Sequence, residues 1–338
     1  MKDLIFAKKV HLYQLHINSI PYRTTPIMGK KKRSVKSIKN GVEVGDKWKQ
    51  QGNDKWGYTW SIPKDYNDLI IANVSNRKED PLSKWTPPET EDCPICLTPL
   101  PLEPGRSWYW GCCGKSVCWG CRLDSLNHSI EEGGVVDFTC HFCREDYESY
   151  TLKRTEKERT RMEFDRYEKG SGDAAYCIAK YYWFGVEGLK KNVPQAIKWF
   201  RKASDAGNGE ACLRLGRVLQ YGMKGMMEMN REESIKYYER AAELGCLRAY
   251  KNLAEVQMEH GLIEESVLSA RKAMMCGVTS DIVTENVLTW FKMKYMTKEE
   301  YAFTLRTHQS AVESFNSPSR KEAIARYHLG KNTWDDFA

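Results

Sequence analysis

The segment AIKWFRKASDAG, residues 196–207, recurs as SIKYYERAAELG at residues 234–245, with an offset of 38 residues. Aromatic residues, small residues and a final glycine return at the same places in both copies. Such a match predicts a repeated structural unit, and a repeat decides the architecture before any other sequence signal. The chain from about residue 172 onward is therefore expected to be a stack of similar units.

A second matching segment precedes each copy: CIAKYYWFG begins at Cys177, and CLRLGRVLQYG begins at Cys212. Small and aromatic residues recur in both at spacings of three and four residues, which is typical of helices. Each unit is therefore predicted to be a helical hairpin. A third, shorter copy occupies residues 248–277 without the long loop between its helices, and a degraded fourth runs from about residue 282 to 311.

Small residues recur at two places in these units. Alanines let neighbouring helices approach closely, and aromatic side chains fill the space between hairpins. Glycines supply the left-handed conformation that ends a helix. The alanines are Ala203, Ala241 and Ala273, and the glycines are Gly207, Gly245 and Gly277.

The spacing of these hairpins resembles that of Sel-1-like repeats, relatives of tetratricopeptide repeats in which the loop between helices is longer. The resemblance covers roughly residues 172–277. It implies an all-α solenoid, and the curved surface of a solenoid suits a peptide or a helix of another protein.

Most of the cysteines lie in one short window, and three pairs have the C-x2-C spacing that places two thiolates on one tetrahedral zinc ion. The opening segment lacks a secretory signal, so an intracellular location, cytoplasmic or nuclear, is expected. Thiols stay reduced there and favour metal over disulfides. The clustered cysteines are Cys93, Cys96, Cys112, Cys113, Cys118, Cys121, Cys140 and Cys143. The solitary ones, Cys177, Cys212, Cys246 and Cys276, are predicted to be core residues.

The order CPIC, CCGKSVC and CHFCR over residues 93–144 resembles a RING finger. The resemblance implies two structural zinc ions held by interleaved ligands. Carried over to this chain, the first ion takes Cys93, Cys96, Cys118 and Cys121. The second takes Cys113, Cys140 and Cys143 together with one further ligand.

The fourth ligand of the second ion departs from the family pattern. Lys115 stands where a RING finger usually has a histidine, and an ammonium group has no lone pair for a metal. Cys112 is the expected replacement, although two adjacent residues must then face one ion. His141 and His128 are the alternatives, each with a second interpretation as a surface or packing residue.

RING fingers commonly act as ubiquitin-protein ligases that form no covalent intermediate, because they position the thioester of a ubiquitin-conjugating enzyme. Ile95 and Arg144 match the family's enzyme-binding surface. Their alternative roles are a small core residue for Ile95 and a solvated cation for Arg144. His141 replaces a common proline and Ser125 a large apolar residue, which leaves ligase activity open.

The aromatic run Trp108, Tyr109 and Trp110 is predicted to pack the small zinc core. The chain has no glycine-rich phosphate loop, no nucleophile elbow and no H-E-x-x-H motif, so no conventional enzyme is indicated. Its 338 residues, 41% of them hydrophobic, contain no apolar run near the roughly 20 residues that span a bilayer. No membrane partner is expected.

Residues 1–90 are predicted to form a basic, mostly disordered arm. The run at residues 30–33 is typical of a nuclear-import signal, a nucleic-acid arm or a solvated tail. Three tryptophans near it would suit stacking on bases, so nucleic acid is a further candidate partner. They are Trp48, Trp56 and Trp60.

The expected order is therefore the arm, a RING-type module at 91–146, a charged connector helix at 147–171 and helical repeats at 172–330. The repeats divide as 172–208, 209–246, 247–278 and a degraded 279–314. Two hypotheses follow. The first is a ubiquitin-protein ligase that recruits a conjugating enzyme through the module and a protein substrate through the repeats. The second is a non-catalytic zinc adaptor that mediates protein contacts.

Overall fold

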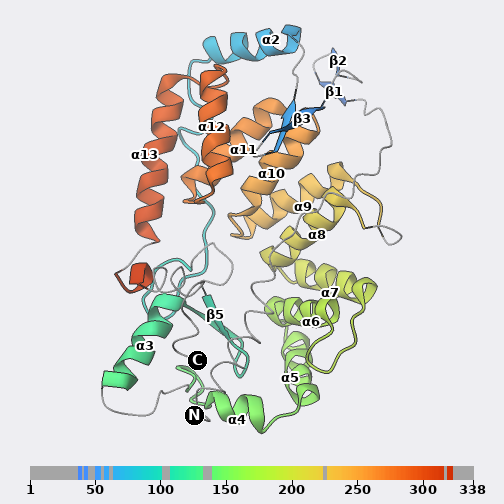
Figure 1. Ribbon diagram of the computed structural model, residues 1–338, viewed down its shortest axis with the longest axis vertical. Helices are drawn as coiled ribbons and strands as arrows, with labels where there is room; N and C mark the ends of the chain where they lie inside the picture. Colours follow the sequence, from blue (N-terminus) through green and yellow to red (C-terminus); the bar gives the residue numbers. More distant parts are fainter. Residues whose placement is uncertain are drawn as a thin grey trace. The chain divides into compact units, whose positions relative to one another are not determined.

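A computed structural model describes four short strands within residues 37–60 and then residues 64–100, 107–131, 139–223, 227–315 and 318–322. The chain divides into two compact units (Figure 1). The first unit takes its described residues from 88–248 and from 313 onward. The second takes them from 37–87 and 249–312.

The first unit is a cysteine-rich segment followed by a row of helices. The cysteine-rich segment contains β5 (Ser107–Trp110), β6 (Lys115–Cys118) and α3 (Trp119–Glu131). The helices after it are α4 (Tyr147–Leu152), α5 (Glu156–Glu168), α6 (Gly172–Phe184), α7 (Val193–Asp205), α8 (Gly209–Tyr221) and α9 (Arg231–Glu243). Helices α6 with α7 and α8 with α9 form hairpins, which confirms the two repeats predicted at 172–208 and 209–246.

Each repeat helix of the first unit begins at a polar side chain that accepts a hydrogen bond from the backbone two or three residues inside the helix. This satisfies one of the backbone N–H groups left without a partner at a helix start. The capping residues are Ser171, Asn192, Asn208 and Asn230. The helices end as predicted, because Gly207 and Gly245 adopt φ of 85° and 78°, the left-handed conformation that glycine tolerates.

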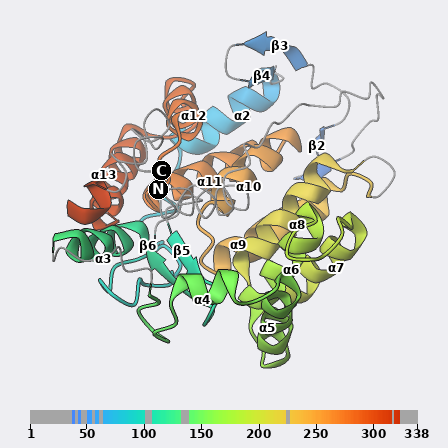
Figure 2. The ribbon, with the colours of Figure 1, turned by 60° about the horizontal axis from the view of Figure 1, so that its bottom comes forward.

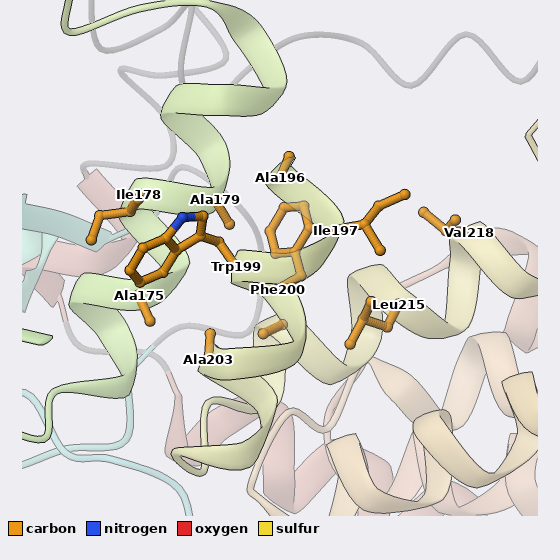
Figure 3. Close-up of a cluster of buried hydrophobic side chains, with 11 residues drawn as sticks. Ala175, Ile178, Ala179, Ala196, Ile197, Trp199, Phe200, Ala203, Leu215 and Val218 are labelled. Atoms are coloured by element: carbon orange, nitrogen blue, oxygen red, sulfur yellow. The ribbon is translucent and has the colours of Figure 1, made fainter. Parts of the chain in front are cut away.

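The core of the first repeat lies between α6, α7 and α8. Figure 3 shows Trp199 of α7 lying towards Ile178 of α6, and Ile197 lying towards Val218 of α8. Ala203, one of the predicted small residues, has no exposed surface. One helix therefore packs on two neighbours, which is how stacked hairpins bury surface that a single hairpin exposes.

Helices α8 and α9 approach closely at Gly216. A Cβ atom at this position would lie 2.7 Å from the ring of Tyr238, which is itself fully buried. We expect Gly216→Ala to lower the free energy of unfolding by about 1–3 kcal/mol, because an extra carbon in a packed interface forces the ring and the helices to move. Urea unfolding followed by circular dichroism measures this loss. Lys236→Ala, on the exposed face of α9, is the control and should change stability by less than about 0.5 kcal/mol.

The second unit contains α2 (Lys64–Ser75), α10 (Ala249–Glu259), α11 (Ile263–Met275), α12 (Asp281–Lys292) and α13 (Lys298–Ser314), the last of which ends at the unit boundary. Helices α10 and α11 pack as a hairpin joined by residues 260–262 alone, at the place and with the short link expected of the third copy. Helices α12 and α13 lie where a degraded fourth copy is expected.

The prediction of a mostly disordered arm up to residue 90 is wrong for residues 64–87. Ile70 and Val74 of α2 are buried, and so is Leu82 in the turn that follows. Asp80 accepts a hydrogen bond of 2.6 Å from the guanidinium of Arg271, which is fully buried in α11. The segment is ordered by partners about 190 residues away in the sequence, and local periodicity carries no signal of such partners.

Arg271 lies at the centre of a buried polar network in the second unit. Its Nε donates to Thr304 and its Nη2 to the carbonyl of Glu300 at 3.3 Å, and the carboxylate of Glu300 pairs with Arg77 at 2.8 Å. A buried cation needs such partners, because leaving it uncompensated is costly. The network ties α11, α13 and the segment after α2 into one unit.

The charged segment 147–171, predicted to be one solvated connector helix, forms two helices instead. Helix α5 starts with a capping box between Thr155 and Glu158 and is an integral part of the first unit. Arg159, Thr160 and Glu163 on one face of α5 are buried. This buried face carries charged residues because they pair with polar groups of neighbouring segments. The composition of α5 is therefore typical of a solvated helix, although one of its faces is buried.

The strands within residues 37–60 form two antiparallel pairs, β1 (Ser37–Lys39) with β2 (Val42–Val44), and β3 (Gln50–Asp54) with β4 (Gly57–Trp60). The basic run at 30–33 and the side chains of Trp48, Trp56 and Trp60 lie outside the part of the chain whose side chains are described. Among the described helices, none combines the length and the apolar character needed to cross a membrane.

Candidate metal centre

The structure gathers the eight clustered cysteines into two groups of four. The Sγ atoms within each group lie within 4.8 Å of one another. One group is Cys93, Cys96, Cys118 and Cys121, and the other is Cys112, Cys113, Cys140 and Cys143. Each group combines one pair with another pair further along the chain, so the two groups alternate in sequence.

Two of the C-x2-C turns have the same backbone. In the first, Cys93 N donates to Thr98 O and Leu97 N donates to Cys93 O, both at 2.8 Å. In the second, Cys140 N donates to Glu145 O at 2.8 Å and Arg144 N donates to Cys140 O at 3.0 Å.

The same two turns also share a strained position. Leu97 and Arg144 occupy equivalent places, four residues after the first cysteine of their turn. Both adopt left-handed φ, 54° and 61° respectively, which non-glycine residues rarely do. The two turns are therefore one local structure used twice, and both direct a pair of sulfurs to the same side.

The remaining cysteines come from the β5–β6 hairpin and the start of α3, which lie beside each other (Figure 2). The turn of the hairpin carries Cys112 and Cys113 and closes when Gly114 N donates to Trp110 O at 2.7 Å, with Gly114 at φ 78°. Cys118 ends β6, and Cys121 lies in the first turn of α3. The hairpin turn thus supplies one pair of sulfurs to the second group, and the end of β6 with the start of α3 supplies one pair to the first.

The distances between sulfurs match a tetrahedral metal site. Sγ of Cys93 lies 3.8 Å from that of Cys121, and Sγ of Cys96 lies 3.9 Å from that of Cys118. In the second group, Cys113 and Cys140 are 3.6 Å apart. Four sulfurs about 2.3 Å from a zinc ion are about 3.8 Å from one another. These separations are also far longer than the roughly 2.05 Å of a disulfide.

The protonation of the thiols reflects their crowding. Burial raises the pKa of Cys113 to about 11, and the thiols of Cys140 and Cys143 add to the rise. Burial also acts to raise the pKa of Cys96, but hydrogen bonds with Thr98 and neighbouring thiols lower it to about 6. Four thiolates this close repel one another, so a divalent cation is the natural counter-charge. The donor set therefore fits a metal ion.

The fourth member of the second group is Cys112, the residue expected from the sequence. Lys115 does not belong to the sulfur group, and its ammonium lies over the Phe142 ring, 4.7 Å from the ring centre. His141 packs edge-on against Trp110, with ring centres 5.6 Å apart, and does not join the sulfurs. The side chain of His128 lies outside the described residues.

The two residues matched to an enzyme-binding surface are both exposed. Ile95 is 42% exposed, so its alternative role as a core residue is wrong, and the neighbouring Leu97 is 75% exposed. Arg144 is exposed directly after the last cysteine. Ser125 is half-buried on α3. The tip of the first turn is therefore an accessible apolar surface.

The aromatic run divides between two faces of β5, as alternation along a strand requires. Trp108 and Trp110 are buried beside the cysteines, as predicted. The guanidinium of the buried Arg122 lies over both rings, at 5.3 and 4.9 Å from their centres. Tyr109 faces the other way, so its predicted place in the zinc core is wrong. Its hydroxyl donates to Glu163 of α5 at 3.2 Å.

That contact belongs to the surface by which the cysteine-rich segment docks on α5. The carboxylate of Glu163 pairs with Arg166 at 2.7 Å, and Arg166 also donates to the carbonyl of Gly111 at 2.7 Å. Gly111 approaches the Tyr150 side chain too closely for any Cβ atom. Sequence reasoning missed these residues, because a Glu and an Arg three apart in a charged helix look like any solvated pair.

The four solitary cysteines are buried, which confirms them as core residues. They are Cys177, Cys212, Cys246 and Cys276.

Comparison with known families identifies two helical hairpins of the first unit, α6 with α7 and α8 with α9. The Sel1 repeat family matches residues 172–208 and 209–246, so these hairpins are Sel1 repeats, a class that mediates protein–protein interactions. The boundaries equal those expected for the first two repeats. The match does not extend to the cysteine-rich segment, and no RING or zinc-finger family is matched.

Curated relatives share short stretches with the chain. It is 36% identical over 55 residues to the ERAD-associated E3 ubiquitin-protein ligase component HRD3A of Arabidopsis thaliana, covering 16% of this chain. It is 26% identical over 76 residues to chitin synthase regulatory factor 1 of Schizosaccharomyces pombe, covering 22% of this chain. The matches span 8% and 17% of the length of these relatives.

Two solved structures are similar in part. A Sel1 repeat protein from Oxalobacter formigenes aligns with a TM-score of 0.38 at 16% identity, over 51% of this chain and 76% of that one. A protective antigen of uropathogenic Escherichia coli strains, which displays an SLR fold, aligns with a TM-score of 0.31 at 20% identity, over 64% of this chain and 49% of that one.

Proposed function

We propose that the cysteine-rich segment is a RING-type module with two structural zinc ions, and that the chain is a ubiquitin-protein ligase. The observation that carries the proposal is the pair of alternating four-cysteine groups, in each of which the Sγ atoms lie within 4.8 Å of one another. Zinc with four thiolates is a closed structural site and leaves no position for a substrate. The cysteines are therefore scaffold, and the module acts by binding.

The proposed partner of the module is a ubiquitin-conjugating enzyme. The exposed tip of the first turn, with Ile95 at its centre and Leu97 beside it, offers an apolar contact held by a rigid backbone. Arg144 offers an exposed cation at the equivalent place in the other turn. Binding there would hold the conjugating enzyme and its ubiquitin thioester in one reactive orientation. Ubiquitin transfer would be faster because the reacting groups are already oriented.

The proposed partner of the Sel1 repeats is a protein, the substrate or an adaptor that brings it. The similarity to HRD3A agrees with this role, since that relative is a component of a ubiquitin ligase. The module and the repeats belong to one unit and are joined through Glu163 and Arg166. A substrate on the repeats would therefore sit at a set distance from the conjugating enzyme.

Ile95→Ala is expected to reduce autoubiquitination at least tenfold while zinc content and folding stay at the wild-type level, because an exposed contact is lost and no core residue is touched. The measurement is an assay on purified protein with a panel of conjugating enzymes and a zinc determination on the same sample. Leu152→Ala, another exposed apolar residue of the first unit, is the matched control.

The second candidate function is a zinc adaptor without ligase activity. It is favoured by His141, which packs on Trp110 where active RING fingers often have a proline, and by Ser125 on α3. Zinc near two ions per chain with no conjugation by any enzyme would favour the adaptor. Ubiquitin chains that form equally well with Ile95→Ala would refute the assigned contact surface.

A further inference from the structure

A short segment near the C-terminal end of the described chain docks on the first cysteine group. Residues 318–322 are helical, and Arg320 within them is only 3% exposed. Its guanidinium donates to the carbonyls of Pro99 at 2.6 Å and Thr98 at 3.2 Å, and to Sγ of Cys96 at 3.4 Å. Both carbonyls belong to the first cysteine turn or the residue that follows it.

The module has a matching surface for this segment at Gly120. A Cβ atom there would lie 2.9 Å from both the backbone N and Cγ of Arg320, and 3.1 Å from the carbonyl carbon of Ser319. Gly120 lies in the first turn of α3, between Cys118 and Cys121. It has no positive φ to explain a glycine, so the close approach of the segment is what requires it.

The chemistry of the contact suits a metal site. Four thiolates around a divalent cation leave a net charge of about −2 in a partly buried place, and positive charge nearby stabilises it. A guanidinium also presents several N–H donors in a fixed plane, so it can bond a sulfur and two carbonyls at once. Arg320 therefore places a positive charge beside the sulfur of Cys96, and its bonds to two carbonyls stabilise the turn that contains Cys96.

We propose that Arg320 is a positioning residue of the first metal site, and that the C-terminal segment completes that site from 224 residues beyond Cys96. The inference rests on the zinc binding of the proposed function. It means that the module is not self-contained: residues 91–146 include all eight cysteines but lack the group that supports one of the two turns.

The test measures metal loss from each group separately. Zinc-loaded full-length protein is mixed with excess chelator, pulsed with N-ethylmaleimide and digested, and mass spectrometry reads the alkylation of each cysteine. We expect Arg320→Ala to release the first group about 10- to 100-fold faster, the usual cost of losing an outer-shell partner. The second group should keep its wild-type rate. Arg320→Lys, which keeps the charge but loses the planar fork, should fall between.

Gly120→Ala tests the same contact from the other side and should reproduce the effect. The double variant should release the first group no faster than the stronger single variant, because both changes break one contact. Lys321→Ala, exposed on the same segment, is the control and should behave like the wild type.

Unchanged release from the first group in both variants, or equal acceleration in both groups, would overturn the assignment of Arg320. A wild-type protein that takes up no zinc is a different result. It would refute the proposed function, and this inference with it.

Discussion

Removal of the two proposed zinc ions is expected to unfold the cysteine-rich segment and to lower the thermal stability of helices α5–α9. Among the residues whose side chains are described, the buried hydrophobic residues of the cluster between β5, β6 and α3 are, apart from cysteines, Trp108, Trp110 and Val117. So small a core does not hold a fold alone, and a structural zinc site contributes roughly 10–16 kcal/mol of apparent binding free energy. Tryptophan fluorescence and a thermal melt, with and without chelator, measure the loss.

The coupling to the helices follows from the docking surface on α5. When the segment unfolds, Glu163 and Arg166 lose Tyr109 and the Gly111 carbonyl as partners. Cys93→Ser should reproduce the effect of the chelator. Cys276→Ser, a change of the same chemistry at a buried cysteine of the second unit, should retain both zinc ions. A melt that is the same with and without chelator would contradict a structural metal.

Glu163→Ala is expected to lower the free energy of unfolding of the first unit by about 3–5 kcal/mol. The carboxylate is fully buried and is bonded to Arg166 and to the hydroxyl of Tyr109. Its removal leaves a largely buried guanidinium without its counter-charge, which is the costly way to break a buried pair. Guanidinium chloride unfolding, followed at a wavelength that reports the helices, measures the change.

Two further variants distinguish the contribution of the buried Glu163–Arg166 pair to stability from the general effect of removing a charge. Glu163→Gln keeps an oxygen for Tyr109 and Arg166 and should cost less than the alanine variant. Glu168→Ala, exposed on the same helix, should change the free energy of unfolding by less than about 0.5 kcal/mol. If Glu163→Ala behaves like Glu168→Ala, the docking surface contributes little to the first unit.

The repeats were predictable because their information is local and periodic. An offset of 38 residues aligned two copies of a helix, and a stacked hairpin needs the same small residue and the same terminal glycine each time. The roles of Ala203 and Gly207 are therefore predictable from the sequence alone. The C-x2-C pairs are predictable in the same way, since this spacing follows from the geometry of a turn around one ion. Their division into two groups of four is an expectation from the resemblance to RING fingers.

The places where prediction failed share one cause. The sequence predicts Tyr109 in the zinc core and residues 64–75 in a disordered arm, whereas Tyr109 bonds Glu163 and α2 is part of the second unit. When the partner of a charged or amphipathic side chain is far away in the sequence, the local pattern is the same as that of a solvent-exposed side chain. Burial of Glu163 is stable only because Arg166 and Tyr109 satisfy it, and no local pattern reports that.

The sequence by itself thus determined the repeat period, the helix ends, the buried solitary cysteines and the eight cysteines of the candidate metal centre. Each of these follows from backbone geometry over a few residues, which recurs wherever the residues recur. Only the tertiary structure decided that Cys112 completes the second group, what faces α5 and that Arg320 reaches Cys96. Those contacts join segments as much as 224 residues apart. They form because a buried polar group needs a hydrogen-bond partner, and such a partner comes near only when the chain is folded.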